Sequence, residues 1–222
     1  MIPLLRYQLD LLLRSQRWLP PFLLYAAFVL IGVRSGEPIL DSLGYASAAL
    51  LPTAIWMVRA CVSNEAPAAR HCTTAATGPA RVHLAKVLTA MLATGALGVL
   101  GTAVVAFVSD PHSAGHRTAV PVLPAAGAGL LTALSCVLLG IAAGALCAWP
   151  VMRSSGWGIS IGAFAALLLL VVGASPANAA VSGMVTGSPT GVIHVPWLPF
   201  AGAALLAAAA TAASCGLSSR RT

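Results

Sequence analysis

The chain has 222 residues, of which 59% are apolar and 8% carry a formal charge. Soluble domains usually contain roughly a quarter charged residues, so this composition excludes an ordinary soluble fold and predicts a membrane protein. The net charge of +7 does not indicate a nucleic-acid partner, because the basic residues are scattered singly with no basic stripe among aromatic side chains. The cysteines at 61, 72, 136, 147 and 215 form no C-x-x-C pair, so we expect reduced packing residues and no metal site.

Residues 1–19 are expected to form an amphipathic helix that lies in the membrane interface. At about 100° per residue, the charged side chains of residues 4–18 fall in one narrow sector and leucines occupy much of the rest. These charged residues are Arg6, Asp10, Arg14 and Arg17. They interrupt the apolar core that a cleavable signal peptide needs. A frayed, solvated N-terminus is the alternative interpretation.

Residues 20–222 are expected to form one transmembrane domain of six helical spans. A span needs about 20 apolar residues to cross roughly 30 Å of hydrocarbon, and six stretches approach that length. They cover approximately 20–33, 42–60, 87–108, 120–148, 157–173 and 197–216. The sequence therefore predicts an all-α, polytopic membrane protein.

The basic residues predict the orientation, since Lys and Arg near span ends stay on the cytoplasmic side. With the N-terminus inside, only Arg34 and Arg117 fall in outer segments. The inner segments hold Arg6, Arg14, Arg17, Arg59, Arg70, Arg81, Lys86, Arg153, Arg220 and Arg221. We therefore expect a multi-pass protein of the cell (plasma) membrane with both termini in the cytoplasm. Its inner loop would be 61–86, and its outer loops 34–41, 109–119 and 174–196.

The outer segment 174–196 has no Lys or Arg and is rich in small residues and proline. It is too apolar for an ordinary water-exposed loop. One interpretation is a re-entrant segment that dips back into the outer leaflet, with its backbone groups buried against protein or facing a wet cavity. The other interpretation is a flexible loop.

Glycines recur at helical spacing in the third, fourth and fifth predicted spans. Such spacing lets helix backbones approach closely. We expect these glycines to be packing sites, although the sequence does not identify their partners. They are Gly95, Gly98, Gly101, Gly140, Gly144, Gly158 and Gly162.

Catalytic motifs have little support, and we predict that the chain is not an enzyme. The single lysine, Lys86, is not preceded by glycine, so the chain lacks a P-loop. A G-x-S-x-G pattern surrounds Ser160, but its candidate base, His194, is expected on the opposite side of the membrane. His112 and His116 are four residues apart in an outer loop. A solvated polar loop is favoured there over zinc binding or pH sensing.

The inner loop between the second and third spans carries the most informative pattern. An acidic residue opens it, a Thr-Gly-Pro step follows, and basic residues lead into the third span. These residues are Glu65, Thr77, Gly78, Pro79, Arg81 and Lys86. His71 and His83 are expected on the polar face of the same cytoplasmic segment. Taken alone, this pattern also fits a basic connector that fixes topology.

In these residues the chain resembles the membrane (permease) subunits of the type-2 ABC exporters. In that family the loop commonly has an acidic residue, a helix, a step between proline and a small residue, and a Lys that opens the next span. An interfacial N-terminal helix, six spans with both ends inside and a re-entrant segment before the last span also recur there. The resemblance implies two permease subunits, identical or different, around a translocation path. It also implies a separate cytosolic ATPase that binds the ATP and contacts a short helix over 65–84, while the chain itself holds no cofactor.

Hydroxyl side chains without charged ones in the predicted spans suit a hydrophobic or amphipathic cargo, such as a lipid, a peptide or a natural product. Arg81 and Lys86 are also expected to meet membrane lipid phosphates. The alternative function is a non-transporting immunity, sensory or scaffold protein. The hydroxyls are those of Thr53, Thr94, Thr102, Thr132, Ser135 and Ser160.

Overall fold

The computed structural model describes residues 1–115, 118–147 and 155–220. Helices make up most of them, which confirms the predicted all-α class. In chain order the helices are α1 (Ile2–Arg14), α2 (Leu19–Gly32), α3 (Ile39–Ser63), α4 (Pro67–Thr77), α5 (Pro79–Val108), α6 (Val122–Cys147), α7 (Ser155–Val171), α8 (Pro176–Gly187) and α9 (Trp197–Arg220). Some residues that carry sequence predictions lie outside the described part: His116, Arg117, Arg153 and Arg221.

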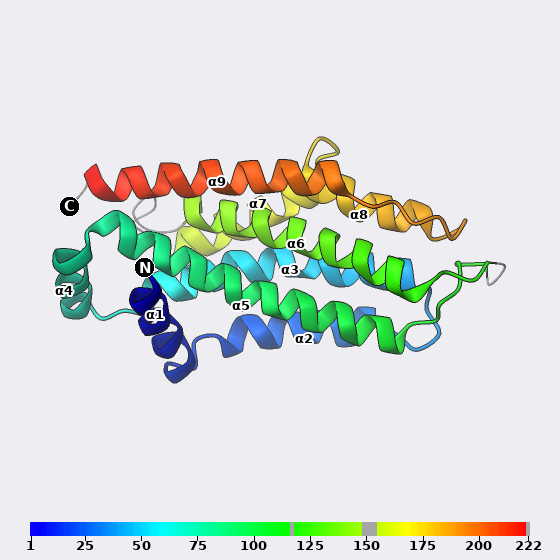
Figure 1. Cartoon of the computed structure of the whole chain (residues 1–222), viewed down its shortest axis with the longest axis horizontal. Helices are drawn as coiled ribbons and strands as arrows, with labels where there is room; N and C mark the ends of the chain where they lie inside the picture. The colour runs from blue at the N-terminus through cyan, green and yellow to red at the C-terminus, as the bar shows by residue number, and fades with distance from the viewer. Residues whose placement is uncertain (116–117, 148–154, 221–222) are drawn as a thin grey trace.

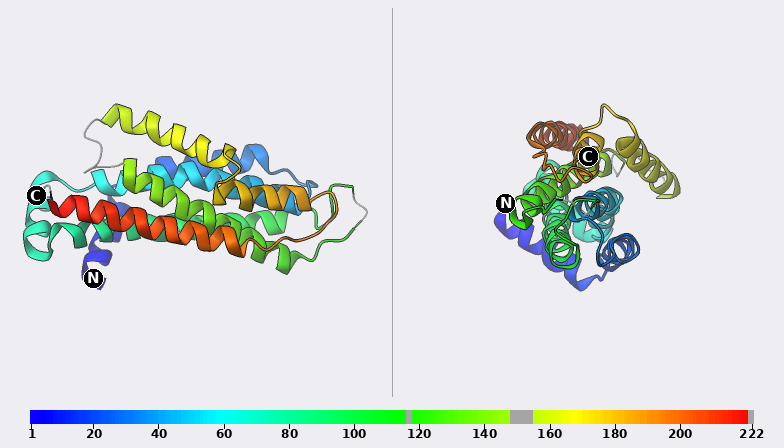
Figure 2. Two further views of the ribbon diagram at one scale, coloured as in Figure 1. Left: turned by 90° about the horizontal axis from the view of Figure 1, so that it is seen from above. Right: turned by 90° about the vertical axis from the view of Figure 1, so that its right-hand side faces the viewer.

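The long helices run side by side along one axis, and α1 and α4 lie across one end of the bundle (Figure 1). Both chain termini are near that same end. The connections around residues 33–38, 109–115, 118–121 and 188–196 lie at the opposite end (Figure 1). Seen end-on, α7 stands at the edge of the bundle (Figure 2).

Among the described residues, four helices are long and apolar enough to cross a membrane: α3, α5, α6 and α9. A fifth candidate is the pair Ser160–Val171 and Pro176–Gly187, bent by 50° at a short break. The predicted first span is α2, whose 14 residues extend only roughly 21 Å. By helix length and hydropathy the chain is a multi-pass membrane protein. Among the described residues its candidate spans number four to five.

Helix α3 lies at the centre of the bundle, in contact with α2, α5, α6, α7 and α8. Leu50, Leu51 and Ala54 on this helix have no exposed surface. Most side chains of α3 pack against protein and not against lipid, so its apolar character reflects its place in the core of the bundle. Only a few of them, such as Trp56 at 43% exposure, reach the surface.

Two of the predicted packing glycines bring α6 directly against α3. A Cβ atom added at Gly140 would lie 2.6 Å from the Cβ of Ala54 and 2.7 Å from the backbone oxygen of Leu51. At Gly144 it would lie 2.9 Å from the Cβ of Val58. Close packing is thus confirmed at these two positions. The prediction of close packing is wrong for Gly95, where an added Cβ would have nothing within 4 Å.

The end of the bundle away from α4 is joined by main-chain hydrogen bonds. The N–H of Ile39 donates to the carbonyl of Asp110 at 3.1 Å, and the N–H of Asp110 donates to the carbonyl of Glu37 at 3.0 Å. The hydroxyl of Ser188 adds a bond to the Asp41 carboxylate at 2.7 Å. These contacts connect all three segments that were predicted as outer loops.

The predicted segment 174–196 contains helix α8 over residues 176–187, so this part is not a flexible loop. Ser175 caps the helix by accepting the N–H of Ala177. The side chain of Asn178 donates to the carbonyl of Leu170 at 2.6 Å, near the end of α7. Because that carbonyl has no helical partner beyond the break, the bond stabilises the bend between α7 and α8.

Replacing Gly140 by alanine is expected to destabilise the protein by about 1–3 kcal/mol, since α3 and α6 must separate. The matched control is Gly127→Ala in the same helix, where an added Cβ meets nothing within 4 Å. That change should be neutral or stabilising by up to about 1 kcal/mol. Thermal unfolding in detergent, followed by dye labelling of the buried Cys136, measures both. Equal midpoints for the two variants would contradict the close contact.

Candidate functional site

Helix α4 forms a short transverse segment between α3 and α5, at the end of the bundle that also carries the termini (Figure 1). Pro67 is its first residue, and the N–H of Gly78 donates to the carbonyl of Thr74 at 2.9 Å at its end. Gly78 has φ +86°, a conformation that glycine adopts without strain. Pro79 then begins α5. The expected single helix over 65–84 is therefore wrong: two helices meet at Gly78.

A buried ion pair joins the residue that precedes α4 in the connection from α3 to a residue of α5. The Nζ of Lys86 lies 2.7 Å from Oε2 of Glu65, and the two side chains are 5% and 0% exposed. The other carboxylate oxygen, Oε1, accepts the hydroxyl of Thr73 in α4 at 3.0 Å. Burial strengthens such a pair, but it also makes the loss of either partner costly.

Helix α1 contacts the same carboxylate through Tyr7. Burial, the negative charge of Glu65 and a hydrogen bond to its carboxylate raise the pKa of Tyr7. We name Tyr7, Glu65, Thr73 and Lys86 the Glu65 cluster. It links α1, α4 and α5 to the connection that follows α3. Arg70 adds a bond from Nη2 to the backbone oxygen of Glu65 at 3.4 Å.

The remaining predicted coupling residues lie around the turn and not in the cluster. Thr77 is exposed and bonds back to the Thr73 carbonyl at 2.8 Å. Gly78 and Pro79 form the break between α4 and α5, and Arg81 is exposed on the first turn of α5. The structure thus brings only Glu65 and Lys86 of the six predicted residues into direct contact.

The charged residues of the predicted interfacial helix divide into two groups. Arg6, Asp10 and Arg14 are exposed on α1, while Gln8 and Leu12 are buried, and α1 packs against α5. Arg17 lies beyond the helix end, and its Nη1 donates to the backbone oxygen of Ser63 at 2.7 Å. This arginine therefore satisfies the C-terminus of α3 instead of extending the charged face of α1.

His83 is placed differently from the prediction. It is 5% exposed, and its Nε2 lies 3.1 Å from the hydroxyl of Ser214 in α9. The expected polar, solvated face is wrong for this residue, whereas His71 on α4 is exposed. The contact joins α5 to α9 beside the Glu65 cluster.

Most of the hydroxyls expected to line a path instead bond to their own helices. Thr53, Thr94 and Thr132 are fully buried and donate to the carbonyl four residues earlier, at 2.8, 2.7 and 2.9 Å. Ser135 does the same at 2.8 Å. Only Ser160 among the six is exposed. The predicted path lining is therefore wrong for this conformation of the chain.

The structure describes three of the four residues named for the two candidate histidine sites: His112, His194 and Ser160. His112 bonds to the carboxylate of Asp110, and His116 lies outside the described residues. His194 lies against α8, near Gly187, and Ser160 is on α7. Among the described residues, no group of three His, Cys, Asp or Glu side chains is placed to hold a metal ion.

Sequence reasoning missed Tyr7 and Thr73 as partners of Glu65. Neither carries a motif, because a tyrosine on an amphipathic helix and a threonine on a short helix are ordinary in those places. A signal did exist for the ion pair. Glu65 and Lys86 were predicted to flank one loop at the same membrane face, where opposite charges can meet.

Comparison with protein-family models, curated proteins and solved structures returned no match for this chain. No family is therefore identified. The chain is a helical protein with four to five candidate membrane spans, and its site is defined by geometry.

Replacing Lys86 by methionine is expected to destabilise the protein by about 3–5 kcal/mol, because it leaves the Glu65 carboxylate buried without its partner. The double variant Lys86→Met, Glu65→Gln should recover part of that loss, since the neutral amide can still bond to Thr73 and Tyr7. Arg81→Met on the exposed face of α5 is the control and should change little. Thermal unfolding in detergent measures all three. A single variant no less stable than the double variant would contradict the ion pair's role.

Proposed function

We propose that this chain is the permease subunit of an ATP-driven exporter, coupled to a separate cytosolic ATPase. The observation that carries the proposal is the Glu65 cluster, which connects an exposed transverse helix to a membrane span and to α1. Helix α4, all of whose residues the structure describes, buries none of them. The carboxylate below it is fully buried. A surface helix seated on a buried charge is suited to transmit force into the bundle.

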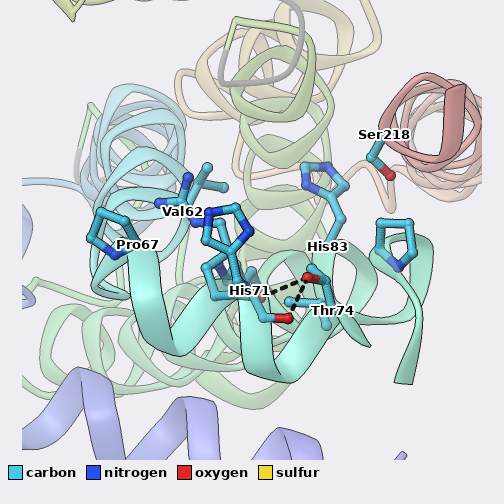
Figure 3. A pocket seen from close by; sticks show the side chains of 10 residues that line it. Val62, Pro67, His71, Thr74, His83 and Ser218 are labelled. Atoms are coloured by element: carbon cyan, nitrogen blue, oxygen red, sulfur yellow. Dashed lines mark hydrogen bonds between the residues drawn. The ribbon is translucent and has the colours of Figure 1, made fainter. Parts of the chain in front are cut away.

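The exposed side of α4 is suited to contact a protein groove. Ala68, Cys72, Ala75 and Ala76 are exposed on it. Small side chains allow close approach, and they require no charge to be desolvated on contact. The two basic side chains of α4, Arg70 and His71, line a cavity between α4 and α5 (Figure 3).

Movement of α4 would act on α5 and α1 through the cluster. Thr73 holds one carboxylate oxygen and Lys86 the other. A displacement of Thr73 would therefore move the Glu65 carboxylate. Lys86 and the first turns of α5 would then be most stable in a different position. ATP binding by the partner can shift the spans only if α4 has different positions in the two states of the membrane domain. The coupling is then the difference between the free energies with which the ATPase contacts α4 in these two states.

Within this proposal the chain crosses the membrane six times, with both termini in the cytoplasm. Helix α2 is one short crossing and the bent pair α7 and α8 is another. The arrangement supports this, because both termini, α1 and α4 lie at one end of the bundle (Figure 1). In sequence, α1, α4 and the segments that adjoin them carry seven of the twelve Lys and Arg residues: Arg6, Arg14, Arg17, Arg59, Arg70, Arg81 and Lys86. Lys and Arg on one side indicate the cytoplasmic face.

The proposed cargo is hydrophobic or amphipathic, such as a lipid, a peptide or a natural product. A cavity of about 330 Å³ between α2, α3 and α7 supports it. Its lining is mostly aliphatic, with Trp56 and Arg59 as its aromatic and charged members. A second permease subunit, identical or different, would complete a path along this peripheral side of the bundle.

The native cysteines offer a direct test of orientation. Cys72 on α4 is exposed, while Cys61 and Cys136 are buried. We expect a membrane-impermeant maleimide to label Cys72 in inside-out vesicles and not in intact cells. The variant Cys72→Ser, Ala119→Cys moves the target to an exposed position at the opposite end and should label with the reverse pattern. Labelling of Cys72 from outside intact cells would contradict the proposed topology.

The ATPase is tested by purifying the tagged chain from its native membranes and measuring the ATP hydrolysis that accompanies it. Ala75→Arg places a long charged side chain on the exposed side of α4. It should lower the accompanying hydrolysis at least about tenfold, which corresponds to ~1.4 kcal/mol of contact energy. Ala119→Arg, the same change at the opposite end, should leave it unchanged. A stable complex without a nucleotide-binding chain would contradict the exporter and favour a non-transporting scaffold or immunity protein.

A further inference from the structure

An apolar groove of about 510 Å³ lies between α5 and α9, and α6 forms its floor. Among the described residues, it shares no lining residue with the cavity between α2, α3 and α7. At the end of the bundle that carries α4, α5 and α9 are in contact, because the thiol of Cys215 donates to the carbonyl of Ala80 at 3.7 Å. Figure 3 shows the ring of His83 on the side of α5 that faces α9. Away from this end the two helices separate, with α6 between them (Figure 1).

The two walls of the groove differ in side-chain size. Leu84, Leu88 and Met91 line it from α5. Alanines line it from α9, and two of them, Ala208 and Ala212, are exposed. Because alanine has no side chain beyond Cβ, the α9 wall leaves space that larger residues would fill. The groove is therefore open to the surface of the bundle.

The polar groups in the groove already have partners. The hydroxyl of Thr211 donates to the carbonyl of Ala207 at 2.6 Å, and the thiol of Cys215 is bonded to Ala80. None of the described lining residues carries a charge. A polar ligand would lose its hydrogen bonds to water there without replacing them. The groove is thus suited to a hydrocarbon chain.

The length of the groove matches one leaflet of a bilayer. Its α9 wall extends from Ala204 to Cys215, which is roughly 16 Å of helix at 1.5 Å per residue. One leaflet contributes about half of a hydrocarbon core of roughly 30 Å. Both α5 and α9 are long and apolar enough to cross a membrane, and the groove begins close to their ends on the α4 side. A hydrocarbon chain in it would therefore extend from the membrane surface on that side towards the bilayer centre.

The volume of the groove fits one such chain. About 510 Å³ corresponds to roughly 17 water molecules in the liquid, and a methylene group is similar in size to a water molecule. A transmembrane helix is too large to enter, since roughly 16 Å of a helix about 10 Å wide occupies on the order of 1,200 Å³. The occupant that the size favours is the acyl chain of a lipid.

A basic side chain stands at the rim of the groove, on the first turn of α5. Arg81 lies about 20° from Leu88 around the helix and about 60° from Leu84, and its side chain is exposed. The ion pairs formed by the described residues do not include it. Arginine binds phosphate groups through several N–H donors at once. A phosphate at the surface end of the acyl chain would thus meet Arg81.

We propose that this groove binds one anionic phospholipid, with an acyl chain between α5 and α9 and the phosphate against Arg81. An anionic lipid is favoured over a zwitterionic one, because the described lining offers no carboxylate to meet a headgroup ammonium and basic groups beside spans attract negative headgroups. The bound lipid would hold α5 and α9 together beyond their contact at Cys215. The inference goes beyond the proposed exporter function and requires no ATPase, so its failure would leave that proposal untouched.

Native mass spectrometry of the purified chain in a neutral detergent measures lipid binding directly. Phosphatidylglycerol is compared with phosphatidylcholine that carries the same acyl chains. We expect the first molecule of phosphatidylglycerol to bind at least about tenfold more tightly, which corresponds to ~1.4 kcal/mol. Equal affinity for the two lipids would overturn the proposal.

Variants connect the binding to the groove and to its rim. Ala208→Phe fills the groove and should weaken the binding of both lipids at least about tenfold. Ala209→Phe, on an exposed position of α9 outside the groove, should leave it unchanged. Arg81→Gln should remove the preference for phosphatidylglycerol, and Arg81→Lys should keep most of it. Arg34→Gln, on an exposed position at the opposite end of the bundle, should have no effect.

Three results would contradict the proposal. Binding as tight in Ala208→Phe as in Ala209→Phe would overturn the acyl-chain site. An undiminished preference for phosphatidylglycerol in Arg81→Gln would overturn the headgroup contact. If Ala208→Phe dissociated a dimer and left lipid binding unchanged, the groove would be a contact between two copies of the chain. All the substituted side chains are exposed, so the variants should fold.

Discussion

The end of the bundle that carries α4 depends on one buried charge. Glu65 has no exposed side-chain surface, and an ionised carboxylate in that position is stable only if its oxygens are paired. Lys86, Thr73 and Tyr7 supply those contacts from three different helices. Consequently the connection after α3, the start of α5, helix α4 and helix α1 have to be placed together. None can shift without changing the environment of the same carboxylate.

The middle of the bundle is held by a different interaction, which requires close backbone contact and no charge. Gly140 and Gly144 let α6 approach α3 near Ala54 and Val58. Between apolar helices in lipid, there is little hydrophobic gain from association, so dispersion contacts at small residues decide which helices pair. Glycine spacing in the sequence indicated that such contacts exist. It could not tell Gly140, which meets α3, from Gly95, which faces open space.

The sequence predicts features that depend on the combined hydropathy of many residues, such as a span. It does not predict features that depend on a single contact between distant residues. Hydropathy located α3, α5, α6 and α9, because each has enough apolar residues for a span. It also located the short α2, since the predicted stretch 20–33 nearly coincides with Leu19–Gly32. It did not show that residues 176–187 form a helix. Glu65 and Lys86 were selected by pattern, but their pairing follows from the antiparallel run of α3 and α5. The burial of His83 likewise depends on α9, which lies 131 positions away at Ser214.

The two ends of the bundle are held so differently that they should differ in mobility. At the end away from α4, main-chain bonds between residues 37, 39 and 110 fix the segments in short, directional contacts. At the opposite end, α4 is held largely by side chains, chiefly Thr73 to the Glu65 carboxylate and Arg70 to the Glu65 backbone oxygen. Rotamer changes can lengthen or replace side-chain contacts without unfolding a helix. Because Gly78 separates α4 from α5, the transverse helix can change its angle while both helices stay intact. A movement of α4 would then enter the bundle at the α4 end and pivot about the opposite end.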